Sequence, residues 1–104
     1  MVGGQVLRWI WDPEKARINR RDHKVSFDLA ELVFDDPLAV TLPDPYPHEE
    51  GWRTIGAPGA QSDVVLFVVH TWPAEDAGGE EVGRIISARK ATRGERRAYE
   101  EGTF

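Results

Sequence analysis

Hydrophobic positions alternate with polar ones in several short segments of the chain, which is the spacing of β-strands. In residues 6–11, Leu7, Trp9 and Trp11 fall on one face and predict a half-buried strand. The apolar run at 64–72 is hydrophobic on both faces, which predicts a central strand. Further strands are predicted at 38–42, 52–56 and 83–90, with loops at 43–47, 58–63 and 73–82.

Capping residues mark the starts of three predicted helices. Asp12 can cap a very polar helix that begins directly after the first strand. Ser26 can cap a second helix over 27–34, where apolar residues recur at helical spacing. Thr92 and Glu95 form a capping box, which opens a last helix.

The elements follow the order β-α-α-β-β-β-β-α in a single domain that spans residues 1–104. Four consecutive strands with short connections pair mainly as antiparallel neighbours. We therefore expect an α+β fold, with an antiparallel sheet of four to five strands and helices packed on one face. The other face would be partly open, and an open sheet face is a natural binding surface.

Composition narrows the class of protein. The chain has 104 residues, of which 40% are hydrophobic and 30% charged, as in a globular protein. No apolar run is long enough to span a membrane, and the first residues do not resemble a signal peptide. We therefore expect no membrane partner, and the composition is compatible with a cytoplasmic location. The absence of cysteine excludes disulfides and thiolate metal sites.

The net charge of −5 is unevenly distributed along the chain. Residues 1–27 carry six basic side chains and three acidic ones, and residues 82–97 carry six basic and one acidic. Residues 28–81 carry twelve acidic side chains and a single basic one, Arg53. Two basic ends around an acidic middle are what a polyanion-binding face needs, and a mixed solvated surface explains the same pattern. A basic segment of a partner could dock on the acidic middle.

Several kinds of site lack their motifs. His23, His48 and His70 share no metal-ligand spacing, so we expect no metal site and no cofactor. No glycine-rich loop joins a strand to a helix, and no serine has a nucleophile-elbow context. What remains is a set of cationic and proton-transferring side chains: Lys15, His23, Arg53, His70, Arg84, Arg89 and Tyr99.

Such a set suits the cleavage of RNA without a metal ion. A base must take the proton of the ribose 2′-hydroxyl, cations must stabilise the phosphorane, and an acid must protonate the leaving 5′-oxygen. Arginine binds phosphate through two parallel hydrogen bonds, and histidine exchanges protons near neutral pH. Each residue also has a structural alternative. A neighbouring carbonyl could satisfy His70, acidic residues could pair with the arginines, and Lys15 and His23 could be an ordinary polar helix face.

Several stretches of the sequence resemble the BrnT family of type II toxins, which are ribonucleases related in fold to RelE. The matching stretches are residues 11–19 (WDPEKARIN), 23–27 (HKVSF), 33–37 (VFDDP), 53–56 (RTIG), 68–71 (VVHT) and 84–99 (RIISARKATRGERRAY). Together they cover about residues 9–101. The last stretch is the most specific, because it is long and its residues are unusual in combination.

The resemblance implies a RelE-like fold and an endoribonuclease toxin that arrests translation in a bacterial cytoplasm. It also implies a cognate antitoxin that neutralises the toxin in a hetero-oligomer and that alone contacts DNA. The positions that match the family's polar motif residues are Lys15, His23, Arg53, His70, Arg84 and Arg89.

The role of each matching residue is assigned from its chemistry. We expect His70 to transfer protons, with Arg53 and Arg84 stabilising the phosphorane. Lys15, His23 and Arg89 would then hold the flanking phosphates. This assignment requires that His70, Arg53 and Arg84 face the same exposed patch.

The sequence also departs from the family at the turn after the first helix. Lys24 stands where the family usually has glycine, and a lysine there is strained if the position needs a positive φ. This departure and the net negative charge favour a second hypothesis. The chain would then be a non-catalytic binding module whose only activity is to hold its antitoxin.

Overall fold

The elements of the protein were located in a computed structural model, which describes residues 7–44 and 51–104. In chain order they are β1 (Leu7–Ile10), α1 (Pro13–His23), α2 (Phe27–Glu31), the 3₁₀ helix η1 (Leu32–Asp35), β2 (Val40–Pro43), β3 (Gly51–Gly56), β4 (Leu66–Thr71), β5 (Ala74–Glu75), β6 (Glu81–Lys90) and α3 (Arg93–Glu101). Within the described ranges, no helix has the length and apolar character needed to cross a membrane.

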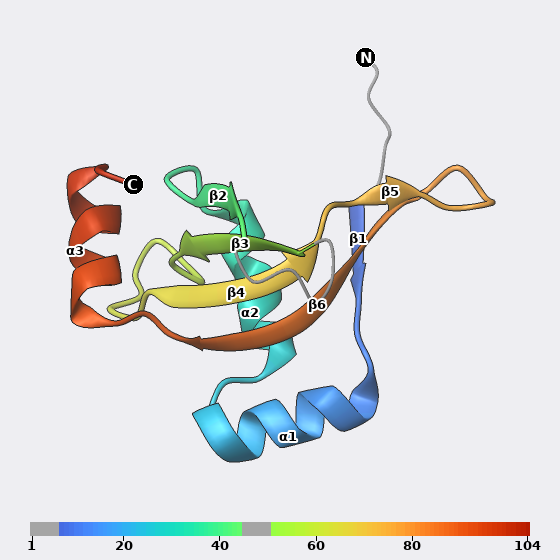
Figure 1. The fold of residues 1–104 in the computed structure, drawn as a ribbon, viewed down its shortest axis with the longest axis horizontal. Helices are drawn as coiled ribbons and strands as arrows, with labels where there is room; N and C mark the ends of the chain where they lie inside the picture. The colour runs from blue at the N-terminus through green and yellow to red at the C-terminus, as the bar shows by residue number, and fades with distance from the viewer. Residues whose placement is uncertain (1–6, 45–50) are drawn as a thin grey trace.

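The strands form one sheet in the order β1-β6-β4-β3-β2, and the short β5 also pairs with β6 (Figure 1). β2, β3, β4 and β6 pair as antiparallel neighbours, as their short connections predict. β1 differs, because it pairs with β6 in parallel, with Leu7 opposite Glu81. The sheet is therefore mixed. A long stretch of chain separates β1 from β6, so hairpin geometry does not constrain this pair.

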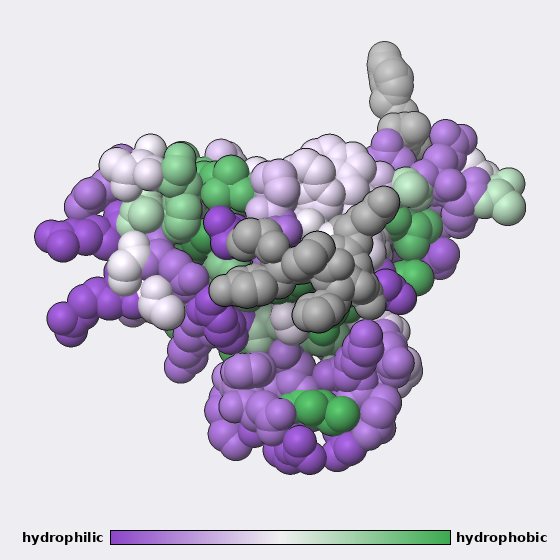
Figure 2. All heavy atoms as spheres, viewed as in Figure 1, coloured by the Kyte–Doolittle hydropathy of each residue, from purple (hydrophilic) through white to green (hydrophobic). Residues whose placement is uncertain are grey.

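The helices cover the sheet unequally. In Figure 1 the sheet is seen from its uncovered face, with α2 behind it, α1 below β6 and α3 at one end. The surface over α1 is mostly hydrophilic, with one hydrophobic patch (Figure 2), as the polar sequence of the helix predicts. The α+β class and the cover of one face are confirmed, while α1 and α3 lie at the margins of the sheet.

The hydrophobic core lies between the sheet and the segment formed by α2 and η1. Along β4, the buried Leu66 and Val68 alternate with the half-buried Phe67 and Val69, so one set of side chains faces the helices. The core cluster consists of Trp9, Val25, Phe27, Ala30, Val33, Leu66, Val68, Ile85 and Ala88.

The predicted capping residues begin all three helices. The Asp12 carboxylate accepts a hydrogen bond from the Glu14 N–H at 2.8 Å, and the Ser26 hydroxyl accepts one from a backbone N–H of α2. Thr92 and Glu95 form the full capping box of α3. Local side-chain hydrogen bonds therefore fix the helix starts where the sequence predicts them.

Element boundaries differ from the sequence prediction in a few places. The helix predicted over 27–34 is an α-helical turn followed by η1, and the strand predicted over 64–72 begins at Leu66. The loop predicted over 73–82 contains β5 and the first residues of β6. Residue 6 of the first predicted strand and residues 45–47 of the predicted loop lie outside the described residues.

Candidate functional site

The candidate site is the face of the sheet that α2 and η1 leave uncovered, called here the open face. Residues opposite each other on neighbouring strands point to the same face. Val69 of β4 is opposite both Arg53 of β3 and Ser87 of β6, and Phe67 is opposite Arg89. All of them alternate with residues that face the helices, so the two arginines lie on the open face.

Arg53 holds a guanidinium group with unused hydrogen-bonding capacity. Its Nε is buried and has no hydrogen-bond partner, while its guanidinium carbon lies 5.9 Å from the centre of the Phe67 ring. A buried polar group without a partner is costly, and functional sites are a common place for one.

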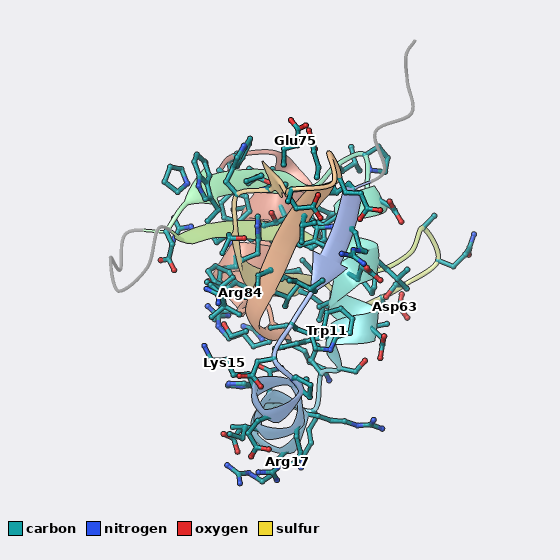
Figure 3. The ribbon with its side chains drawn as sticks, turned by 90° about the vertical axis from the view of Figure 1, so that its right-hand side faces the viewer. Trp11, Lys15, Arg17, Asp63, Glu75 and Arg84 are labelled. Carbon is teal, nitrogen blue, oxygen red and sulfur yellow. The ribbon has the colours of Figure 1, made fainter. Side chains whose placement is uncertain are left out.

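Arg84 and Lys15 reach the same side of the molecule from different elements. Arg84 is exposed and directly precedes the buried Ile85, which places it on the open face of β6. Its backbone N–H donates to the Thr71 hydroxyl at 2.9 Å. Figure 3 shows the Arg84 and Lys15 side chains on the same side of the molecule, with Asp63 on the other.

A shallow hollow of about 230 Å³ lies between α1 and β6. Lys15 and His23 enter it from α1, and Ser87 enters it from β6. Both α1 side chains are exposed. Because Ser87 is also opposite Val69 of β4, the hollow continues the open face toward Arg53. The hollow thus holds the imidazole of His23 and the ammonium group of Lys15 together with the carboxylate of Asp22.

Arg89 lies on the open face but is held by another element. It forms a bidentate ion pair with Glu95 of α3, with N–O distances of 2.8 and 3.0 Å. Its guanidinium carbon also lies 4.1 Å from the centre of the Phe67 ring. The hydrogen bonds of this pair raise the pKa of Arg89 and lower the pKa of Glu95. Arg89 therefore fastens α3 to β6, and a phosphate would have to compete with Glu95.

His70 lies on the opposite face of the sheet from Arg53 and Arg84. Its side chain is only 2% exposed, and its ring packs edge-on against Trp9 and Phe34, with centroids 5.2 and 4.9 Å away. The expectation that His70 shares an exposed patch with the two arginines is therefore not met. An intact β4 separates them.

Both ring nitrogens of His70 have partners. Nδ1 donates to the Thr71 carbonyl at 2.8 Å, so Nε2 accepts from the Thr54 hydroxyl at 2.6 Å. The Thr54 hydroxyl in turn lies 2.7 Å from that of Thr41. Burial lowers the pKa of His70, against the weaker opposing effect of the Thr71 carbonyl. This is the neutral, carbonyl-satisfied histidine that the sequence left open as the structural alternative.

Asn19 is a motif residue to which the sequence assigned no role. Its amide nitrogen donates to the carbonyls of Val25 and Ala88 at 3.0 and 2.8 Å, and its amide oxygen accepts from the Ala88 N–H at 3.0 Å. The side chain is buried and completes the edge of β6 beyond the end of β1. The sequence offered one signal for this role: Asn19 follows Ile18, one of the few apolar residues of α1, and so lies near the side of the helix that can pack against the sheet.

The residues present offer little to a metal ion. Within 7–44 and 51–104, no group of three or more His, Cys, Asp or Glu side chains is arranged to hold a metal. The open face offers guanidinium groups that can bind phosphate, and the hollow beside it offers an ammonium group and an imidazole.

Comparison with known proteins identifies the family. Residues 11–95 match the family model described as the ribonuclease toxin BrnT of a type II toxin–antitoxin system. No curated protein sequence matches the chain. The 1.1 Å crystal structure of the Brucella abortus ribonuclease toxin BrnT is 21% identical, with a TM-score of 0.59, and the match covers 85% of this chain and 100% of that one. At 21% identity the structural match supports only a shared fold. Membership of the family is supported by the family model, which matches most of the chain. The chain belongs to the BrnT family of type II toxin–antitoxin ribonuclease toxins.

Proposed function

We propose that this protein is an endoribonuclease that cleaves RNA without a metal ion, inhibits translation and is neutralised by a cognate antitoxin. The observation that carries the proposal is that Arg53 and Arg84 lie on the open face, while Lys15 and His23 line the hollow between α1 and β6. Cationic side chains on an uncovered sheet face can hold a polyanion in an extended path. Membership of the BrnT family supports RNA as that polyanion.

The reaction follows from the groups on the open face. The ribose 2′-oxygen attacks the adjacent phosphorus as its proton passes to a base, and the bond from phosphorus to the 5′-oxygen breaks as an acid protonates that oxygen. The products are a 2′,3′-cyclic phosphate and a free 5′-hydroxyl. Arg53 and Arg84 stabilise the negative charge of the phosphorane, because guanidinium groups bind it through paired hydrogen bonds.

Proton transfer is reassigned from His70 to His23. His70 is 2% exposed and lines a separate hollow with Trp9 and Phe34. His23 is exposed in the hollow beside Lys15 and Ser87. Arg53 and Arg84 lie on strands that are separated by one strand and are offset by two residues along the sheet, so their backbones are about 12 Å apart. Long arginine side chains can span this distance and meet one phosphate or two neighbouring ones. Lys15 holds a flanking phosphate.

The remaining features follow from the family. The antitoxin forms a hetero-oligomer with this chain and is the only component that contacts DNA. The toxin uses no cofactor and acts in the cytoplasm, where its RNA substrates are. These statements rest on the type II toxin–antitoxin assignment of residues 11–95.

Cleavage of RNA by the purified protein tests the proposal. We expect cleavage that persists in EDTA and leaves 2′,3′-cyclic phosphate ends. Arg84→Ala and Arg53→Ala should each lower the rate on the order of 100-fold, the cost of removing one donor to a developing oxyanion. Arg97→Ala is the matched control, because Arg97 is exposed and pairs with Glu101 within α3. Loss of cleavage in EDTA, or full activity of both open-face variants, would contradict the proposal.

A non-catalytic module that only binds its antitoxin is the second candidate. The burial of His70 favours it, because within the described residues His23 is then the one histidine left to transfer a proton at this site. If the folded free protein binds its antitoxin tightly yet leaves RNA intact at every pH from 5 to 9, this second function replaces the first.

A further inference from the structure

A second hollow, called here the acidic hollow, lies on the helix side of the molecule. It has a volume of about 440 Å³ and is formed by η1, the turn that follows it and the turn between β3 and β4. The residues that line it are Leu32, Asp35, Asp36, Pro37, Leu38, Ala57, Pro58, Gly59, Ala60 and Ser62. None of them belongs to the open face, and Asp63, next to Ser62, lies on the opposite side from Arg84 in Figure 3.

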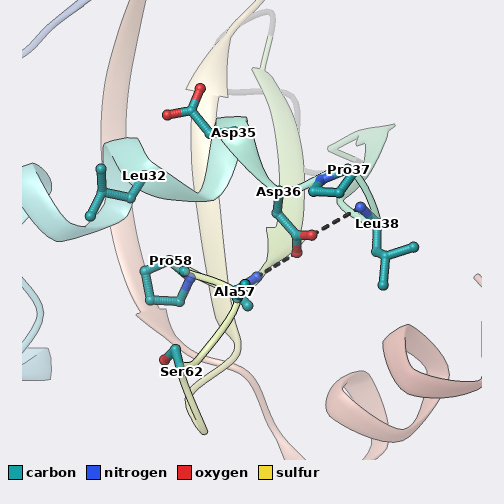
Figure 4. A pocket seen from close by; sticks show the side chains of 10 residues that line it. Leu32, Asp35, Asp36, Pro37, Leu38, Ala57, Pro58 and Ser62 are labelled. Atoms are coloured by element: carbon teal, nitrogen blue, oxygen red, sulfur yellow. Dashed lines mark hydrogen bonds between the residues drawn. The ribbon is translucent and has the colours of Figure 1, made fainter.

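Large apolar side chains border the acidic hollow and remain exposed. Leu38 is 70% exposed and Leu32 is 45% exposed. Figure 4 shows them on opposite sides of the hollow, with Ala57 and Pro58 between them. Single exposed leucines are common, but two that flank a concave apolar surface are typical of a site that receives an apolar side chain from a partner.

The frame of the acidic hollow is held in place by Asp36. Its carboxylate accepts hydrogen bonds from the backbone N–H groups of Leu38 and Ala57, at 2.9 and 2.8 Å, and from the Tyr99 hydroxyl. Burial opposes ionisation of Asp36, but these hydrogen bonds outweigh it and lower its pKa. The hollow is therefore preformed, which reduces the entropic cost of binding.

The charge around the acidic hollow has one sign. Asp35 lines the hollow, and Glu31 and Asp63 directly adjoin the lining residues Leu32 and Ser62. No ion pair within 7–44 and 51–104 involves these three carboxylates. The sequence has no lysine or arginine between residues 25 and 52.

α3 stands beside the hollow in Figure 4, and two of its three arginines are neutralised within the helix. Arg96 pairs with Glu100 and Arg97 pairs with Glu101, each at 3.3 Å. Apolar complementarity and unpaired negative charge together select one kind of occupant. It is a protein segment that carries a large apolar side chain flanked by lysine or arginine.

We propose that the acidic hollow is an anchoring site for a basic amphipathic segment of the antitoxin, and that occupation of it leaves the open face free. The identity of the partner rests on the proposed function, whereas the chemistry of the segment rests on the hollow. RNA is excluded as the occupant, because the surrounding carboxylates would repel phosphates. The anchor holds the two proteins together, and contacts elsewhere block the RNA.

The affinity of the antitoxin for single-site variants tests the anchoring site. Leu38→Lys places a positive charge in the hollow and should weaken binding at least tenfold, as for other interface anchors. Leu29→Lys is the matched control, because Leu29 is 40% exposed on α2 but does not line the hollow. Asp35→Lys should also weaken binding, and by a larger factor at low salt than at high salt.

Hydrogen exchange of the complex locates the contact independently of any variant. We expect antitoxin binding to protect amides in 32–38 and 57–62. Protection confined to 51–55 and 84–89, or unchanged affinity of Leu38→Lys, would overturn the proposal, as would the absence of any complex with the antitoxin.

RNA cleavage by the free protein separates this inference from the proposed function. Leu38→Lys should cleave RNA as fast as the unmodified chain, because the hollow is remote from the open face. If no variant cleaves RNA but Leu38→Lys still weakens the complex, the ribonuclease proposal fails while the anchoring site stands. If cleavage is intact and antitoxin affinity is unaffected, the anchoring site fails alone.

Discussion

Lys24 carries the backbone strain that its position in the sequence predicts. Its φ is 60°, and within the described residues it is the only non-glycine residue with a positive φ. Its backbone N–H donates to the Arg20 carbonyl at 3.0 Å, which closes α1 with a left-handed cap. The left-handed conformation costs a residue with a Cβ about 1–2 kcal/mol.

Lys24→Gly should therefore stabilise the protein. The gain in the free energy of unfolding is about 1 kcal/mol, because the greater flexibility of glycine in the unfolded chain offsets part of the relief. Urea unfolding would register it as a higher midpoint at an unchanged slope. Lys24→Ala is the control, since alanine keeps the Cβ. An equal gain from alanine would show that strain is not the cause.

His70 should make the stability of the fold depend on pH. Burial lowers its pKa in the folded state below the ordinary value of 6.5, so the unfolded chain binds the proton more readily. The two states bind equally few protons above pH 6.5, and stability is lost as pH falls below that value. Comparison of urea midpoints at pH 7.5 and 5.5 should show this loss. It should shrink in His70→Gln and persist in His23→Gln, the exposed-histidine control.

The two residues differ in what sequence could foresee. The strain at Lys24 was predicted on the condition that its position needs a positive φ, and the φ of 60° meets that condition. The face of His70 was not predictable, because β4 is apolar on both sides. Alternation groups His70 with Val68 and Leu66, but it cannot tell which of two hydrophobic sets faces the helices.

At the scale of elements, the hydrogen bonds of a single side chain contribute more to holding α1 on the sheet than the apolar packing of the helix does. α1 is polar and buries only Asn19, whose three hydrogen bonds join it to the backbone of β6 and to Val25. The amide thus replaces a neighbouring strand at Ala88. Here a polar side chain takes the place of the backbone hydrogen bonds between strands. Such a contact leaves no periodic pattern of hydrophobic residues, so it cannot be detected from the hydrophobic pattern of the sequence.

Asn19→Ala should destabilise the protein by about 3 kcal/mol, because three buried hydrogen bonds of about 1 kcal/mol each are lost. Thermal unfolding would show the lower midpoint, and hydrogen exchange would show faster exchange in α1 and around Ala88. Arg20→Ala is the control on the same helix, because Arg20 is the next residue along the chain and its side chain is exposed. Equal stability of the two variants would mean that packing alone holds α1.

The pairing of strands was predictable where the paired strands are close together in the sequence. The antiparallel run from β2 to β6 follows from short connections, and the capping box of α3 from Thr92 and Glu95. The parallel pair of β1 with β6 was not predictable, because its partners are far apart in sequence and no local signal selects the neighbour.

At the scale of the whole molecule, opposite charges lie on opposite sides. The open face carries Arg53, Arg84 and Lys15, while Asp35 and Asp63 lie toward the helix side. The net charge of −5 therefore conceals a cationic face, which is the face that the proposed RNA binding would use. Charge blocks along the sequence indicated this separation, but their places on the surface required the fold.

Salt should weaken RNA binding in proportion to the phosphates held on the open face. With three cations engaged, the logarithm of the affinity should fall with the logarithm of salt concentration at a slope of about −2 for single strands. Fluorescence anisotropy with a labelled RNA measures this slope, and Arg84→Ala should make it shallower. A slope near zero would mean that binding does not use these cations. Asp63→Lys, on the far side, should leave the slope almost unchanged.

The parallel pairing of β1 with β6 also sets when this protein becomes complete during its own synthesis. Leu7 has no partner until Glu81 has been translated, and Arg84 and the α3 anchor Arg89 come later still. A ribosome that is still translating the middle of the message therefore carries a chain with neither a closed sheet nor an assembled cationic face. The parallel pair thus makes assembly of the sheet wait for the synthesis of β6, although β1 is the first element of the described chain.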